Sequence, residues 1–337
     1  MNLETPYLGM RLRSPLVASA GPLSQTVDGI KALADGGVGA VVLYSVFEEQ
    51  IRRQAEIDEE LELAHANAFS EALSYFPSVP GADGVGVPAK YLDLLERGAK
   101  EVDIPLIGSI NGSSIGGWTK YARQMQDAGA SAIELNIYFV VGDFSLSGRD
   151  VEQRHIDILS SVKESVDIPV AVKLSPYFSS AGNMCLQLDQ AGADGLVLFN
   201  RFLQPEIDVD SMSVEPEVEL STSYEGRLPR TWIAALRGRV GASIAATSGV
   251  ERAEDIIRYL LSGADVVMST SALVRHGTDY SRQLLDGLTS WMTEKGYQDV
   301  ADFRGLLSVR HGDENAYQRA GYVTALQRAK ETYGTVL

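Results

Sequence analysis

The sequence predicts a TIM barrel, a closed ring of eight parallel strands in which each strand is followed by a helix. One pattern recurs: a helix-like stretch ends at glycine, a small residue follows, and an apolar run begins. Glycine supplies the left-handed conformation that ends a helix, and an apolar run without alternation indicates a strand covered on both faces. The clearest copies are Gly37-Val38-Gly39-Ala40, Gly129-Ala130-Ser131-Ala132, Gly192-Ala193-Asp194-Gly195 and Gly263-Ala264-Asp265.

A second repeated pattern supports this architecture. Asp-Ile-Pro precedes an apolar run at both 103–105 and 167–169, a separation of two βα units of roughly 30 residues each. A doubly wound open sheet is the alternative fold. The predicted strands are 15–20, 39–45, 105–110, 131–137, 169–175, 195–200, 243–247 and 265–270, with helices over 117–128, 151–165 and 251–262 among those that follow them.

The regular spacing is interrupted three times, at 46–88, 138–150 and 201–228. Each interruption follows a predicted strand and therefore belongs to the carboxyl face of the barrel, where long loops serve as lids or partner surfaces. The tail from residue 279 predicts the eighth helix and a helical extension. Barrels of 337 residues form one unit, so we expect a single domain over 1–337.

Composition excludes several classes of protein. A net charge of −16 argues against nucleic acid or an anionic membrane as the main partner. No apolar run approaches the roughly 18 residues of a membrane helix. The single cysteine, Cys185, excludes an internal disulfide and indicates a reducing compartment, so we expect a cytoplasmic protein with a packed thiol at this position.

The chemistry of a barrel lies at the carboxyl ends of its strands. Every predicted strand ends in small or polar residues. This is explained in part by the turns that follow the strands, because such residues favour turns. A lysine inside VAVKLSP is different, because Lys173 at the end of a buried strand is costly unless it is paired or functional. The other strand ends carry Ser19-Ala20-Gly21, Tyr44-Ser45, Ser109-Ile110-Asn111, Asn136, Asn200-Arg201, Thr247-Ser248-Gly249 and Ser269-Thr270-Ser271.

The last two strands predict a phosphate site. Ser248-Gly249 is expected to open a helix, with Glu251 completing a capping box, and free backbone N–H groups there favour an anion. Thr270 and Ser271 offer further donors from the neighbouring strand. Simple helix capping is the alternative interpretation.

Other motifs are weak. Residues 112–116 match G-x-S-x-G but lack the other elements of a hydrolase, and a turn is the better interpretation. The four histidines show no metal-ligand spacing, so we expect no metal site.

The order of these segments resembles the dihydroorotate dehydrogenases, chiefly the class 1 enzymes, and the related domain of dihydropyrimidine dehydrogenase. The resemblance covers about residues 3–310, and E-L-N and V-K-L-x-P-Y-F are its most specific parts. The segments are SPLVASAGPL, VVLYS, PLIGSING, IELNIY, VAVKLSPYF, LVLFN, WIAALR, ATSGV, STSAL and GYQDVADFRG.

The resemblance implies an FMN-binding barrel that moves hydride between flavin and a C–C bond beside a carbonyl. It places Lys173 at the N1/O2 side of the flavin, where a fixed cation stabilises the negative charge of the reduced ring. Asn136 would lie beside flavin and substrate, and Tyr44, Asn111 and Asn200 are candidates for substrate contacts. The remaining flavin contacts would be Ser19, Ala20, Gly21, Ser45, Thr247, Ser248, Gly249, Thr270 and Ser271.

The sequence departs from the family at the substrate side. The family has a catalytic Cys or Ser in E-L-N-x-S-C-P-N, whereas Phe139 stands there and accepts no proton. Val141 replaces a substrate-binding Asn, Tyr44-Ser45 replaces Lys-Ser, and the family's substrate loop is not recognisable within 46–88. The flavin half of the site is thus retained and the orotate half is altered.

A substitute acid or base is therefore needed for dihydroorotate oxidation. Tyr138 is our first candidate, with Tyr44, Ser145 and Ser147 as others. A non-catalytic flavin-binding protein and a non-redox barrel enzyme acting on a phosphorylated metabolite remain alternatives. One cysteine cannot hold an iron–sulfur cluster, so electrons would leave to a small oxidant such as fumarate or to a separate partner. The family also implies a homodimer.

Overall fold

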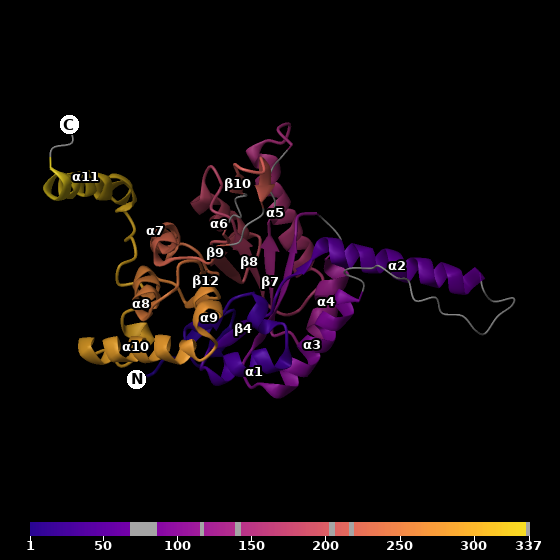
Figure 1. Cartoon of the computed structure of the whole chain (residues 1–337). Helices are drawn as coiled ribbons and strands as arrows, with labels where there is room; N and C mark the ends of the chain where they lie inside the picture. Colours follow the sequence, from indigo (N-terminus) through magenta and orange to yellow (C-terminus); the bar gives the residue numbers. More distant parts are fainter. Residues whose placement is uncertain (68–85, 115–117, 139–142, 202–205, 216–218, 335–337) are drawn as a thin grey trace.

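The computed structural model describes residues 1–67, 86–114, 118–138, 143–201, 206–215 and 219–334. Within them eight parallel strands close into a barrel, with helices on the outer face (Figure 1). Strand β13 pairs with β3 and β4 pairs with β6, which closes the ring and excludes the open sheet. The barrel strands are β3 (Leu16–Ala18), β4 (Ala40–Val42), β6 (Leu106–Gly112), β7 (Ala132–Ile137), β8 (Val170–Leu174), β9 (Gly195–Leu198), β12 (Ser243–Ala246) and β13 (Val266–Ser269).

Seven of the predicted strands contain one of these, and β6 extends two residues past the predicted 105–110, so the barrel prediction is confirmed. A helix follows each strand, and its apolar side packs on the outside of the ring. The three predicted helices correspond to α4, α5 and α8 within a few residues. The barrel helices are α1 (Val27–Asp35), α3 (Val87–Glu101), α4 (Thr119–Asp127), α5 (Gly148–Lys163), α6 (Ala181–Gln190), α7 (Arg227–Leu236), α8 (Ala253–Ser262) and α10 (Tyr280–Lys295).

Two longer helices extend away from the barrel, α2 (Glu48–Asn67) and α11 (Glu314–Tyr333), and α11 is the predicted terminal extension (Figure 1). In the part of the chain that the structure describes, no helix has both the length and the apolarity needed to cross a bilayer. The short elements are α9 (Ser271–His276) and the 3₁₀ turns η1 (Pro22–Ser24), η2 (Ser223–Gly226) and η3 (Val300–Asp302).

A hairpin of β1 (Thr5–Tyr7) and β2 (Met10–Leu12) supplies much of the packing inside the barrel. The inward-facing strand residues include four alanines, which leave room along the barrel axis. Tyr7, Leu8 and Leu12 are fully buried against this layer. The sequence analysis did not predict the hairpin, because the vacancy that it fills exists only after the ring has closed.

The three interruptions follow strands as predicted, but they contain more regular structure than loops. Strand β5 (Val46–Phe47) and helix α2 occupy the start of 46–88, and α3 begins at Val87. A hairpin of β10 (Glu206–Asp208) and β11 (Ser213–Glu215), η2 and the start of α7 lie within 201–228. Helix α5 begins inside 138–150. The long loops that the sequence predicted are thus partly wrong, and the single domain over 1–337 stays a prediction.

Candidate active site

A cavity of about 340 Å³ lies at the carboxyl ends of the barrel strands. Most of the residues selected from the strand ends line it, although they come from seven different strands or the turns after them. The lining includes Ser19, Ala20, Asn111, Asn136, Tyr138, Lys173, Asn200, Thr247, Ser248, Thr270 and Ser271. The closure of the barrel therefore brings together residues up to about 250 positions apart, as the barrel geometry requires.

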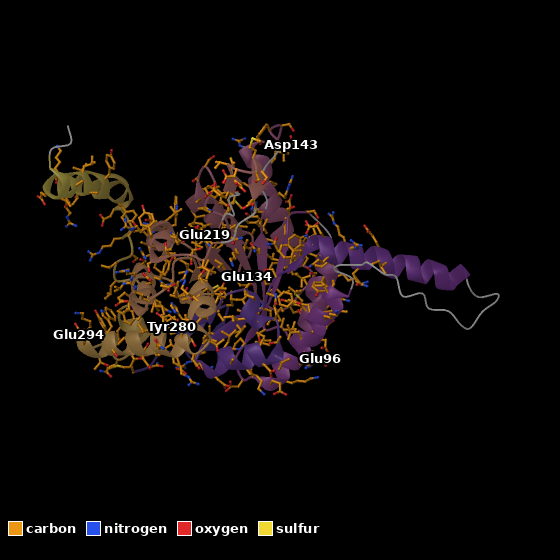
Figure 2. All side chains as sticks on the ribbon, viewed as in Figure 1. Glu96, Glu134, Asp143, Glu219, Tyr280 and Glu294 are labelled. Carbon is orange, nitrogen blue, oxygen red and sulfur yellow. The ribbon has the colours of Figure 1, made fainter. Side chains whose placement is uncertain are left out.

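Lys173 lies on the inner side of this cavity beside a buried carboxylate. Its Nζ is 3.5 Å from Oε1 of Glu134, and the two side chains are 8% and 1% exposed. Figure 2 shows Glu134 near the centre of the barrel. Adjacent strands place both residues inward, because Asn136 on β7 is in register with Lys173 on β8 and Glu134 lies two residues before Asn136. The cost of burying the lysine is thus reduced by an ion pair that the sequence analysis did not identify.

The Tyr7 hydroxyl lies below this pair. It is buried, and its pKa is raised well above the ordinary value, first by desolvation and then by the negative charges of Glu134 and Asp265. Among the described residues, neither the Tyr7 hydroxyl nor the Glu134 carboxylate has a hydrogen-bond partner. The charge of Lys173 is therefore the main compensation for Glu134 in this part of the core.

Two asparagines are joined across the opening of the cavity. The Asn200 side-chain amide donates to Oδ1 of Asn136 at 2.7 Å. This bond uses one acceptor of Asn136 and leaves its own amide N–H groups as donors, so the pair can bind carbonyl oxygen atoms. Both residues were selected from the sequence, but their direct contact was not predicted.

The predicted helix start at Ser248-Gly249 is wrong. Both residues have left-handed φ values of 74° and 69°, and α8 begins only at Ala253. The carboxylate of Asp255 accepts the N–H groups that precede this helix, at 3.2 and 3.1 Å. Glu251 instead pairs with Arg275 and His276, so it forms no capping box with Ser248.

At the turn of residues 248–249, a neighbouring segment of the chain nevertheless packs very closely against the backbone. A Cβ atom on Gly249 would lie 2.4 Å from the backbone nitrogen of Gly226. A Cβ atom on Gly21 would lie 2.5 Å from Cγ2 of Thr270, whose hydroxyl donates to the Ser19 carbonyl at 2.9 Å. Only glycine fits at these two positions, so the backbone rather than a side chain borders the cavity there.

Ser221, which lies in the segment before η2, was not among the residues predicted from the strand ends. Its N–H and its hydroxyl both donate to Oγ of Ser271 at 3.0 Å, and its Oγ accepts the N–H of Gly249 at 3.3 Å. Ser221 thus connects the turns after β12 and β13. No local signal distinguished it, since it lies within an interruption rather than at the end of a strand. Phe47, Phe199 and Arg201 also line the cavity.

Four of the residues that were expected to contact flavin or substrate lie outside the cavity lining, as do the alternative acid or base candidates Ser145 and Ser147. Tyr44 packs edge-on against Tyr91, with ring centroids 5.0 Å apart, and desolvation raises its pKa. The Ser45 and Ser109 hydroxyls are 2.8 Å apart. Gly21 and Gly249 border the cavity only through the close approaches described above. Phe139 and Val141 fall outside the described residues, so the structure does not place the altered base position.

Cys185 is not a catalytic residue. It lies in α6, is 1% exposed, and burial raises its pKa to about 12. The prediction of a packed thiol is confirmed.

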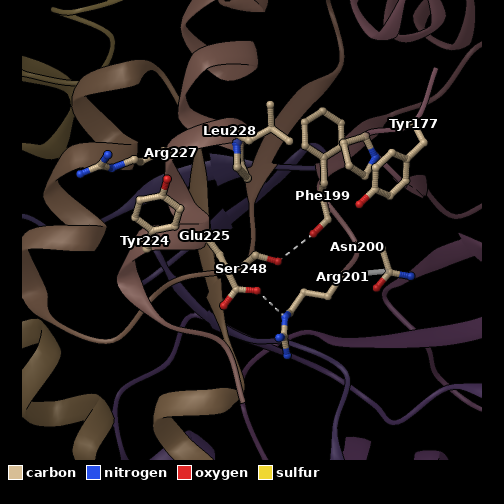
Figure 3. A pocket seen from close by; sticks show the side chains of 11 residues that line it. Tyr177, Phe199, Asn200, Arg201, Tyr224, Glu225, Arg227, Leu228 and Ser248 are labelled. Carbon is tan, nitrogen blue, oxygen red and sulfur yellow. Dashed lines mark hydrogen bonds and ion pairs between the residues drawn. The ribbon is translucent and has the colours of Figure 1, made fainter. Parts of the chain in front are cut away.

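A second, outer cavity of about 460 Å³ adjoins the first (Figure 3). Phe199, Asn200, Arg201 and Ser248 line both cavities. The Arg201 guanidinium donates to Glu225 at 2.8 Å, and the Ser248 hydroxyl donates to the Phe199 carbonyl at 3.0 Å. Tyr177 and Tyr224 flank this space with exposed rings. The outer cavity is therefore an approach to the inner one.

The fold and the site together define an α/β-barrel enzyme with a polar site at its carboxyl face. The family model for dihydroorotate dehydrogenase matches residues 79–292, more than half of the chain. The chain belongs to the dihydroorotate dehydrogenase family, and it is an oxidoreductase of the class that acts on CH–CH donors. This confirms the resemblance noted from the motifs.

Similar proteins match over most of their length. The catalytic subunit of dihydroorotate dehydrogenase B (NAD(+)) from Methanothermobacter thermautotrophicus is 26% identical over 314 residues, covering 90% of this chain and 98% of that protein. The protein of the same name from Thermoplasma acidophilum is 26% identical over 315 residues, with the same coverage. That from Methanocaldococcus jannaschii is 26% identical over 307 residues, covering 87% of this chain and 94% of its own.

Proposed function

We propose that this chain is an FMN-dependent oxidoreductase that oxidises dihydroorotate or a related cyclic compound with a C–C bond next to a carbonyl. The observation that carries the proposal is the meeting of Lys173, Asn136 and Asn200 with the serine and threonine hydroxyls of the last two strands in one cavity. Members of this family are flavoproteins, generally with FMN.

The residues present fit FMN in two respects. The phosphate would meet the turns after β12 and β13, where the hydroxyls of Thr247 and Ser271 would be its side-chain donors, since the Ser248 and Thr270 hydroxyls already donate to backbone carbonyls. Gly21 and Gly249 keep side chains out of this region through their close backbone approaches. Anions bind well where several N–H and O–H donors converge without a competing carboxylate.

The charge of Lys173 would favour the reduced form of a bound flavin. Bound FMN would supply hydride acceptance from carbon. Lys173 would stabilise the negative charge that a reduced flavin ring gathers, in surroundings where water screens charge poorly. Glu134 holds the ammonium group in place from below. The joined amides of Asn136 and Asn200 would bind the carbonyl oxygens of the substrate and orient the carbon that loses hydride.

The proton that accompanies hydride loss needs an acceptor. Tyr138 lines the cavity directly after β7, one residue before the position at which the family carries its base. We assign the acid–base role to Tyr138 on this placement. Phenol oxygen can accept a proton as phenolate or relay one through its hydroxyl.

Electrons would leave to a separate acceptor. The similar proteins from archaea are named as catalytic subunits of an enzyme that uses NAD(+), and one cysteine cannot hold an iron–sulfur cluster in this chain. A separate partner subunit fits these observations, as does a small oxidant. A homodimer of the chain stays a prediction, which light scattering of the purified protein would test.

The visible spectrum of the purified protein tests the cofactor, and anaerobic addition of dihydroorotate tests the substrate. We expect a yellow protein with flavin bands that bleach on addition. A yellow protein that does not bleach would retain FMN and reject dihydroorotate, which would leave a related substrate or a non-catalytic flavin protein. A colourless protein that takes up no added FMN would refute the proposal.

A further inference from the structure

A third cavity lies on the outer wall of the barrel, between α7 and α8, which pack side by side (Figure 1). Its volume is about 320 Å³. Three arginines line it, Arg227 and Arg230 from α7 and Arg258 from α8. An apolar part of the wall includes Leu261 and Leu307. Three guanidinium groups around one cavity are unusual in a chain whose net charge is −16.

The positive charge of this cavity is only partly compensated. Arg258 pairs with Asp255 at 2.9 Å, and among the described residues no carboxylate lines the cavity itself. Arg227 lies over the Tyr224 ring at 4.7 Å, and Arg230 lies over the Tyr259 ring at 5.7 Å. With Asp255 cancelling one of the three charges, about two positive charges remain, a match for a dianion.

Arg230 is only partly compensated within this group of three arginines. Its Nη1 is buried and has no hydrogen-bond partner among the described residues. Its pKa is lowered, first by burial and then by the positive charges of Arg258 and Arg227, while Tyr259 and Asp255 act in the opposite direction. A buried N–H donor without an acceptor is costly, and repulsion within the group adds to the cost. A phosphate group would relieve the repulsion, because it brings two negative charges, and its oxygens would accept from the arginine side chains where they line the cavity.

We propose that this cavity binds a small phosphomonoester, with its phosphate among Arg227, Arg230 and Arg258 and its organic part against Leu261 and Leu307. Guanidinium groups bind phosphate through paired N–H donors. The apolar wall and the Tyr317 ring at the edge of the cavity offer a surface for a compact organic group. The volume lies near the lower limit for ligand pockets, which favours a small molecule.

A bound phosphate would also act on the active site. The Tyr259 hydroxyl, on the ring below Arg230, donates to the carbonyl oxygens of Ser248 at 2.6 Å and Thr247 at 3.2 Å. Both residues line the candidate active site. Fixing Arg230 therefore restrains Tyr259, and through it the turn at the end of β12. The cavity on the wall is a regulatory site whose occupancy stiffens this turn.

Phenyl phosphate is a suitable probe, and calorimetric titration of the purified protein saturated with FMN measures its binding. Bound FMN would keep the probe out of the phosphate position of the active site, and free FMN, which is itself a phosphomonoester, is removed by gel filtration before the titration. We expect one binding event that weakens at least about tenfold in both Arg230→Gln and Arg227→Gln. Arg11→Gln, which removes an equal charge from the exposed Arg11–Glu4 pair, serves as the matched control.

Equal affinity in the wild type and both arginine variants, or no binding, would overturn the site. Arg227 is exposed, so its variant tests the site even if the Arg230 variant fails to fold. Because Arg227 also lines the outer cavity (Figure 3), Arg201→Gln, which lines the outer cavity and not this one, should leave the affinity for phenyl phosphate unchanged. If the protein takes up no FMN, the proposed function is wrong. The phosphomonoester site is still tested in that case, because the affinity for phenyl phosphate either depends on Arg230 and Arg227 or does not.

Hydrogen exchange followed by mass spectrometry tests the coupling without reference to flavin. We expect phenyl phosphate to slow exchange in residues 243–252, and Tyr259→Phe to abolish this effect while the probe still binds. Unchanged exchange in the wild type at saturating probe would overturn the regulatory role.

Discussion

The ammonium nitrogen of Lys173 lies 3.5 Å from Oε1 of Glu134, and both side chains are buried at the base of the candidate active site. Each charge is costly in this position without the other. The pair therefore links the stability of the barrel to the electrostatics of its active site, and the two effects can be measured separately.

Removing the lysine alone should destabilise the fold. Lys173→Met leaves the Glu134 carboxylate buried without a partner charge, and we expect a loss of about 3–5 kcal/mol in the free energy of unfolding. The double variant Lys173→Met/Glu134→Gln should recover most of this loss, since both charges are gone. Urea unfolding of the single and double variants measures the difference. A double variant as unstable as the single one would contradict the pairing.

Removing the carboxylate alone should change the redox behaviour. Glu134→Gln keeps the Lys173 charge and removes the negative charge below it, so the reduced flavin should be stabilised and the reduction potential should become more positive. Spectroelectrochemical titration of the FMN-loaded variant measures the shift. Glu294→Gln makes the same charge change on the exposed face of α10 and should leave the potential unchanged. A shift to more negative potential would refute the role of Glu134.

The acid–base assignment predicts a catalytic loss without a binding loss. Tyr138→Phe should lower the rate of flavin reduction by the substrate about 10²–10⁴-fold, the usual contribution of a positioned acid or base. The affinity for FMN should not change. Tyr44→Phe is the matched control, because Tyr44 packs on Tyr91 outside the cavity lining. If the Tyr44 variant loses activity and the Tyr138 variant does not, the assignment is wrong.

Glu48 stabilises the turn that follows β6. Its buried carboxylate accepts the N–H groups of Ser113 and Ser114 at 2.9 and 3.0 Å and pairs with Arg52 at 2.7 Å. Glu48→Ala leaves these donors unpaired, and we expect a loss of about 1–3 kcal/mol in the free energy of unfolding. Chemical denaturation measures it, with Glu49→Ala on the same helix as control. Equal stability of the two variants would show that water replaces the carboxylate.

The burial of His155 should make the folded protein less stable in acid. It is buried in α5 against Phe178, and desolvation lowers its pKa below the ordinary value of 6.5. The unfolded chain therefore takes up a proton at a higher pH than the folded protein does. Stability from this group is complete above about pH 6.5 and falls as the pH drops toward the folded pKa. His155→Gln should reduce this slope in unfolding experiments, whereas exposed His311→Gln should not.

The positions of the strands follow from local sequence. Glycine before four of the apolar runs marks where a helix ends and a strand begins, and a run without alternation requires cover on both faces. The residues at the ends of these runs therefore account for most of the cavity lining, including Lys173 and Asn136. The family could be recognised for the same reason, since its motifs lie at these strand ends.

The errors arose where contacts rather than local patterns decide the structure. Ser248 and Gly249 precede a helix in sequence, but contacts with Gly226 and Ser221 hold them in a left-handed turn. Helix α2 lies in a region that was predicted as a loop, with few apolar residues to give it a period. These features depend on segments that are distant in the chain, and no local window contains them.

The amino-acid sequence by itself determined the barrel, its strand ends and the lysine at the end of β8, because helix ends and buried strands are encoded by neighbouring residues. Only the tertiary structure decided which charge faces that lysine, that Tyr7 fills the space below it, and that Ser221 joins the last two turns. Ring closure brings Tyr7, Glu134 and Lys173 together from three separate strands, and long-range packing of this kind is not written in any local pattern.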